Sequence, residues 1–180
     1  MGQGMNALAV MSEGLQEGAL YLVSAPLAVA ALVATCLLLG TPGRSLRAST
    51  LLLVVAAATL TRWFPVLDDA VVVPSLLVVL GLALALNWQA RGAAAPLSAV
   101  TGGSAIGLGG GMQVASWPEV AGGDAVLLAL LLCASLLLAK APRMDRFAKG
   151  AVVGRRMVGA WIAAIGVLML ALWWHSRTTG

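Results

Sequence analysis

The pattern that decides the fold is plainest in residues 119–156, which read EVAGGDAVLLALLLCASLLLAKAPRMDRFAKGAVVGRR. Acidic residues stand at one end of this stretch, an uncharged apolar run fills its middle, and six basic residues follow. An apolar run of about 20 residues crosses a bilayer as a helix, and positively charged loops stay on the cytoplasmic side during insertion. The stretch therefore predicts one membrane span with its acidic end outside and its basic end inside.

The same alternation recurs along the chain. Nine of the eleven Lys and Arg residues fall in three short segments, which contain Arg44 and Arg47, then Arg91, then Lys140, Arg143, Arg146, Lys149, Arg155 and Arg156. Six of the seven Asp and Glu residues fall between these segments, namely Glu13, Glu17, Asp68, Asp69, Glu119 and Asp124. We therefore expect an all-α membrane protein, a six-transmembrane-helix bundle with both termini outside (N-out and C-out).

Six apolar stretches come close to spanning length and form a single integral-membrane domain, 1–180. We expect spans near 19–39, 47–64, 70–88, 96–117, 122–139 and 157–174, with a basic cytoplasmic loop at 140–156. Asp69 and Asp124 are expected as N-caps of the third and fifth spans, because an anion is favoured at a helix N-terminus. Residues 1–18 contain no Lys or Arg, so we expect no cleavable signal peptide.

The composition agrees with a membrane class. The chain is 61% hydrophobic and 10% charged, with a mean hydropathy of +0.97. Soluble domains carry about 25% charged residues, so most of this surface must face lipid. The net charge of +4 does not point to a nucleic-acid partner, because the basic residues flank apolar spans. The expected location is the bacterial cytoplasmic (inner) membrane, as a multi-pass protein.

The expected fourth span, residues 96–117, reads PLSAVTGGSAIGLGGGMQVASW. Gly103, Gly107 and Gly111 share one helix face, and small residues at this spacing let two helices approach closely in a membrane. Three alternatives stay open for this helix: a packed central helix, a contact for another subunit, and the lining of a substrate path. The last span has a weaker small-residue face, which consists of Gly159, Ala163 and Gly166. We expect this face to pack against the glycine face of the fourth span. The path would be lined by Thr101, Ser104 and Gln113.

Two ionisable residues lie near the outer ends of the first two spans. Arg62 precedes Trp63 near the end of the second span, and Glu17 precedes the first span. Long charged side chains often extend to the membrane surface, which is one interpretation of both. The other is an ion pair between Glu17 and Arg62, since charges at membrane depth usually have a partner.

The chain has one histidine, His175, and two cysteines in different spans. These residues cannot supply the usual ligand set of a transition-metal site or a nucleophile with its base. We therefore expect no catalytic, cofactor-binding or metal-binding residues, no cofactor and no enzymatic activity.

The order of segments resembles the HupE/UreJ family of membrane proteins, which are nickel or cobalt permeases and hydrogenase or urease accessory proteins. The resemblance covers most of residues 14–140. It rests on GLQEGALYLVSAPLAVAALVA, RSLRASTLLLVVAAATLTRWF, AVVVPSLLVVLGLALALN and TGGSAIGLGGGMQVASW, which are similar to that family's first four spans.

The family's metal ligands are replaced in this chain. Gln16 and Glu17 stand where the family has Asp-His, Arg62 corresponds to the second-span His, and the fourth-span His falls at about Leu108. The resemblance therefore implies a degenerate member, in which Glu17 and Arg62 substitute an ion pair for a metal.

Two functions follow as hypotheses. The first is a non-catalytic accessory or structural subunit of an integral-membrane assembly, with the lipid bilayer and other membrane subunits, or further copies of itself in a homo-oligomer, as partners. The alternative is a small multi-pass permease for nickel, cobalt or an uncharged solute. An assembly factor or an enzyme that needs a bound cofactor is a third, weaker class.

Overall fold

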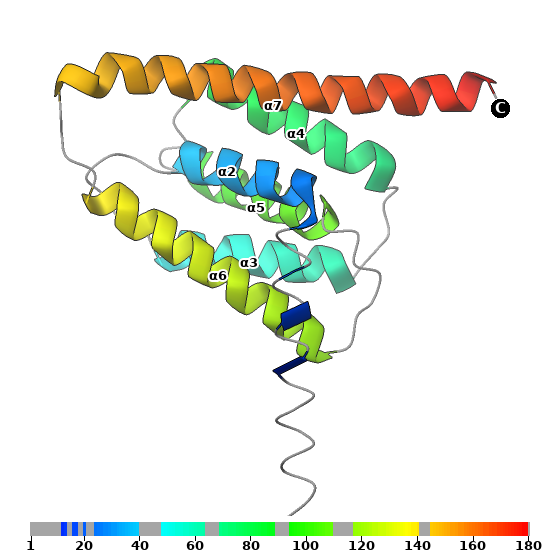
Figure 1. Cartoon of the computed structure of the whole chain (residues 1–180), viewed down its shortest axis with the longest axis horizontal. Helices are drawn as coiled ribbons and strands as arrows, with labels where there is room; N and C mark the ends of the chain where they lie inside the picture. The colour runs from blue at the N-terminus through cyan, green and yellow to red at the C-terminus, as the bar shows by residue number, and fades with distance from the viewer. Residues whose placement is uncertain are drawn as a thin grey trace, which may run out of the picture.

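The computed structural model describes residues 12, 13, 16, 17, 20, 24–39, 48–63, 69–88, 94–109, 117–140 and 145–179. This part of the chain is all-helical, which confirms the all-α part of the expected fold. Its helices are α2 (Pro26–Leu39), α3 (Ala48–Trp63), α4 (Asp69–Ala85), α5 (Ala94–Gly109), α6 (Trp117–Lys140) and α7 (Asp145–Thr179) (Figure 1).

Successive helices run in alternating directions along the long axis of the molecule (Figure 1). The packing of α4 on α7 illustrates this: Gly81 lies beside Gly159, whereas Pro74, earlier in α4, lies beside Gly166, later in α7. As a result, the C-terminal ends of α2, α4 and α6 lie at one end of the bundle with the N-terminal ends of α3, α5 and α7. We call this end the basic end, because the three basic segments of the sequence adjoin it, and the opposite end the acidic end.

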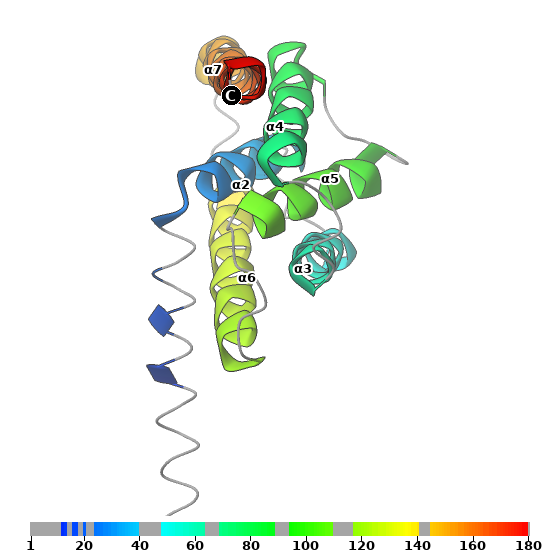
Figure 2. The same ribbon diagram turned by 90° about the vertical axis from the view of Figure 1, so that its right-hand side faces the viewer.

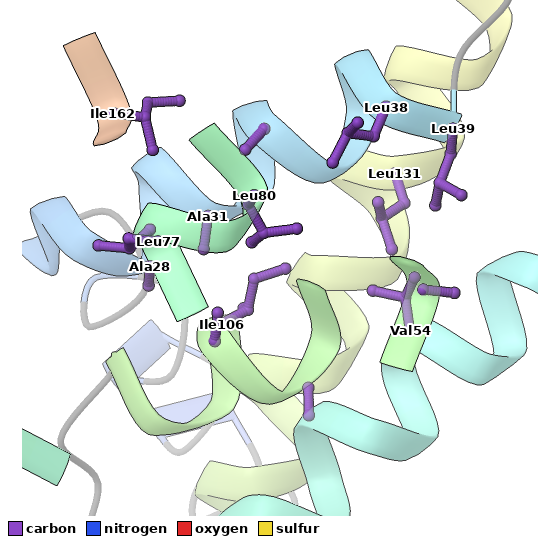
Figure 3. Close-up of a cluster of buried hydrophobic side chains, with 14 of the residues drawn as sticks. Ala28, Ala31, Leu38, Leu39, Val54, Leu77, Leu80, Ile106, Leu131 and Ile162 are labelled. Carbon is purple, nitrogen blue, oxygen red and sulfur yellow. The ribbon is translucent and has the colours of Figure 1, made fainter. Parts of the chain in front are cut away.

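The centre of the bundle is α5, which packs against α2, α3 and α4. Seen along the long axis of the molecule, α7 lies beside α4 on one side, and α3 and the tilted α6 lie on the other (Figure 2). The hydrophobic core gathers Ala31, Leu80, Ile106 and Leu131 from four different helices (Figure 3). Three alanines of α2 are fully buried, namely Ala28, Ala31 and Ala34. Because alanine side chains are small, the backbone of α2 approaches the neighbouring helices closely.

A Schellman motif ends α4. Asn87 has a positive φ of 55°, its N–H donates to the Leu84 carbonyl, and the N–H of Trp88 donates to the Ala83 carbonyl. These two bonds satisfy carbonyls that have no partner within the helix, and Asn is one of the residues that tolerate this conformation. The helix therefore stops at Ala85, three residues before the expected end of the third span.

The last two helices are longer than expected. α6 begins at Trp117 rather than near 122, so Asp124 lies inside the helix and is not its N-cap. α7 begins at Asp145, so most of the expected cytoplasmic loop 140–156 is helical. Between 145 and 157 there is no proline, and Ala, Lys and Arg are good helix formers, so the helix continues through this segment despite Gly150 and Gly154.

Two helices are long and apolar enough to cross a bilayer by length and composition, through the segments Val120–Leu137 and Val152–Thr178. Pro26–Leu39, Ala48–Trp63 and Ala70–Ala85 are shorter apolar helices. Fourteen residues of α2 rise about 21 Å at 1.5 Å per residue, compared with about 30 Å for a hydrocarbon core.

Candidate functional site

A buried cluster of polar side chains joins α3 to α6. Among the described residues, Arg62 is the one charged residue that the fold buries, and its side chain is 4% exposed. Its Nη1 donates to Oδ1 of Asp124 at 2.7 Å. Thr59 Oγ1 donates to Oδ2 of the same carboxylate at 2.6 Å, which is the shorter of its two contacts, since the Val55 carbonyl of its own helix lies 2.9 Å away. Both oxygens of Asp124 therefore accept a hydrogen bond from α3.

The local sequence explains how the cluster forms. Thr59 and Arg62 are three residues apart, so they share one face of α3. On α6, Gly123 immediately precedes Asp124, and a Cβ built on Gly123 would lie 3.2 Å from Nη1 of Arg62. The missing side chain of Gly123 thus leaves room for the guanidinium beside the carboxylate.

Burial of the cluster favours a lasting ion pair between Arg62 and Asp124. Asp124 is 17% exposed, so both charges are largely withdrawn from water, which is costly unless each is neutralised by the other and by hydrogen bonds. Arg62 still has one buried donor, Nε, without a hydrogen-bond partner among the described residues. Chemically, this arrangement fastens one helix to another, because the carboxylate is fully engaged by α3.

The cluster is important for holding α6 against the bundle. This helix packs on α3 and, less extensively, on α2, whereas α4 and α7 pack along much of their shared length. Many of its leucines point away from the bundle, including Leu128, Leu130, Leu132, Leu136 and Leu137. The ion pair is therefore a main tie between α6 and the rest of the bundle at the acidic end.

The partner of Arg62 differs from the one expected from the sequence. Glu17 is exposed and forms no ion pair with Arg62, which pairs with Asp124 instead. Arg62 also does not extend to the surface, because the neighbouring helix offers a carboxylate at the same depth. Asp124 was assigned to a helix cap because the expected start of the fifth span lay five residues too late. Starting the helix at Trp117 places Asp124 two turns inside it, opposite the end of α3.

The glycines of α5 pack against two helices. A Cβ on Gly103 would collide with the Val54 carbonyl of α3, and one on Gly107 would lie 2.5 Å from the Ala58 carbonyl. On another side of α5, Gly102 lies against the Thr35 side chain of α2. The structure thus shows a packed central helix over the described part, 94–109, while Gly111 lies outside the described residues.

The second small-residue face has a different mate from the one expected. Gly159 and Ala163 of α7 lie against Gly81 of α4, and Gly166 lies against the Pro74 carbonyl, with a built Cβ 2.7 Å from that oxygen. These contacts are with α4, and α5 does not pack on α7. Gly81 was missed in the sequence because it stands alone in an apolar run, without a second glycine at helical spacing.

Three polar residues were expected to line a path. Thr101 is half-buried, and its hydroxyl donates to the Leu97 carbonyl of the preceding turn at 2.9 Å. Ser104 is half-buried one turn later on the same side of α5. Gln113 lies outside the described residues.

Within the described ranges, no group of three or more His, Cys, Asp or Glu side chains could hold a metal ion. No family model, curated protein or solved structure matches this chain.

Proposed function

We propose that this chain is a multi-pass protein of the bacterial cytoplasmic membrane, in which six helices cross the bilayer and the basic end faces the cytoplasm. Its support is the charge alternation of the sequence together with the alternating directions of the helices. Those directions bring the three basic segments to one end of the bundle, as the positive-inside rule requires. Both termini then lie outside.

The apolar surface is consistent with this proposal. Large apolar side chains that face outward occur on each of α2 to α7, for example Val33, Leu52, Leu82, Leu97, Leu136 and Leu168. Lipid chains make such exposure favourable, whereas exposed patches of more than a few hundred Å² are rare on soluble monomers. Helices as short as α2 and α3 further require a locally thinner bilayer or flanking residues that complete the span.

Within the membrane, the proposed role is that of a non-catalytic accessory or structural subunit of a larger assembly. The observation that supports this role is the Arg62–Asp124 pair, because these two charges neutralise each other and hold α6 to α3. The outward leucines of α6 and the outward tryptophans of α7, Trp161 and Trp174, then offer apolar surface to neighbouring subunits.

The sequence resemblance adds a proposal about ancestry, namely a degenerate HupE/UreJ member. In this proposal Arg62 stands where the family keeps a histidine, and Asp124 rather than Glu17 is the residue that neutralises it. The tie between α3 and α6 would then occupy the place of a former metal ligand.

Purification of the tagged chain in mild detergent tests the subunit role. We expect other membrane proteins to co-purify in fixed stoichiometry. We also expect Asp124→Ala to reduce this co-purification, because α6 loses its tie, while Glu17→Ala, at an exposed carboxylate, leaves it unchanged. A lone chain or homo-oligomer that carries Ni²⁺ or Co²⁺ into vesicles would instead favour the permease.

A further inference from the structure

The N-terminal part of α7 extends beyond the helix on which it packs. Gly159 lies beside Ala85, the last residue of α4, so residues 145–158 continue α7 past that end by about 20 Å (Figure 1). A Cβ built on Gly150 or Gly154 would meet no atom within 4 Å, whereas Gly159 is tightly packed. The side of this overhang that carries Gly150 and Gly154 is therefore not covered by the described part of the bundle.

The overhang is rich in basic residues, and their spacing in the sequence is helical. Arg146, Lys149 and Arg156 recur in the sequence at spacings of three and seven, which return to one side of an α-helix. Arg156 is exposed. Beyond it the same side of α7 becomes apolar and stays exposed, through Met157, Ala160, Ala164 and Val167.

A second arginine anchors the overhang to α4. Arg155 points to the other side, where its Nη2 donates to the Trp88 carbonyl at 3.0 Å, just past the end of α4. Its buried Nε has no hydrogen-bond partner in the described part of the chain. Trp88 itself is 57% exposed, and exposed tryptophans are typical of the membrane–water interface.

We propose that the overhang, residues 145–156, binds the headgroup of an anionic phospholipid whose acyl chains lie along the apolar side of α7 beyond Arg156. Cationic groups over the headgroup region and a continuous exposed apolar face over the acyl region match the two parts of such a lipid. The inference rests on the proposed membrane location, because the basic end must lie at the surface of one leaflet.

Spin-labelled lipids test the inference on the full-length protein in phosphatidylcholine vesicles. The electron paramagnetic resonance spectrum gives the fraction of labelled lipid that the protein immobilises. We expect labelled phosphatidylglycerol to associate several-fold more strongly than labelled phosphatidylcholine. Each basic residue near an anionic surface contributes about a fivefold preference. Arg156→Gln should therefore lower the preference by about fivefold, which abolishes it if the starting preference is no larger than that. Adding Lys149→Gln should lower any remaining preference, and high salt should weaken the preference of the unmodified chain.

Arg177→Gln is the matched control, because it removes one positive charge at the acidic end and should leave the preference unchanged. Equal association of the two lipids, or an undiminished preference in the Arg156→Gln, Lys149→Gln chain, would overturn the inference. Vesicle flotation separates this failure from that of the proposed function. A chain that floats with vesicles but shows no preference contradicts only the lipid site, whereas a chain that does not float contradicts the membrane location.

Discussion

Arg62 and Asp124, 62 residues apart in the sequence, meet at 2.7 Å between the end of α3 and the second turn of α6. Their contact converts two charges that are unfavourable inside a membrane bundle into a tie between helices. The stability of the fold should therefore depend on keeping the two together.

A double-mutant cycle on this pair should show strong coupling. Arg62→Ala or Asp124→Ala alone leaves a buried charge without its partner and should lower the free energy of unfolding by about 3–5 kcal/mol. The double variant should lose much less than the sum of the two single losses. Denaturation in mixed detergent micelles measures these energies. Additive losses would mean that the two side chains do not interact, and Glu17→Ala should change the free energy by less than about 0.5 kcal/mol.

The Thr59 hydroxyl should contribute separately to the same tie. Thr59→Val keeps the shape of the side chain but removes the 2.6 Å bond to the Asp124 carboxylate, so it should lower the free energy of unfolding by about 1.5–3 kcal/mol. Thr101→Val is the matched control, because that hydroxyl donates to a carbonyl of its own helix. Equal losses in the two variants would contradict a special role for Thr59.

Glycines at helix contacts should respond differently from glycines in the open. A Cβ on Gly159 would lie 2.5 Å from the backbone N of Ala85, so Gly159→Ala should force α4 and α7 apart and lower the free energy of unfolding by about 1–3 kcal/mol. Gly154→Ala meets open space and should raise it by up to about 1 kcal/mol through helix propensity. The same detergent denaturation compares the two, and an unchanged or raised free energy of unfolding in Gly159→Ala would contradict the packing of α4 on α7.

The sequence predicted the parts of the fold that follow from short-range pattern. Apolar runs between charged segments predicted an all-helical chain, and the spacing of Gly103 and Gly107 predicted a closely packed face. The start of α6 could have been predicted, because Ser116 and Glu119 have the capping-box spacing and Pro118 falls in the first turn, although the apolar run itself starts later. The start of α7 at Asp145 was less predictable, because it lies in a charged segment that the pattern of basic loops places outside the spans.

Partners across helices were harder to predict because they depend on register between distant segments. Glu17 and Asp124 both stand near the outer end of the predicted bundle, and only the packing of α6 on α3 decides which of them meets Arg62. Likewise, both α4 and α5 offer small residues against which Gly159 could pack closely. The choice of α4 depends on the arrangement of all six helices.

Site-directed labelling at two positions of α7, one toward the basic end and one at the acidic end, tests the central claim, a bundle with its basic end inside and both termini outside. Single cysteines would replace Arg156 at the basic end and Ser176 at the acidic end, in a chain with Cys36→Ala and Cys133→Ala. In bacterial spheroplasts, a membrane-impermeant maleimide should label Ser176→Cys at once and Arg156→Cys only after the membrane is permeabilised. Labelling of both positions from the outside, or of Arg156→Cys alone, would contradict the proposed topology.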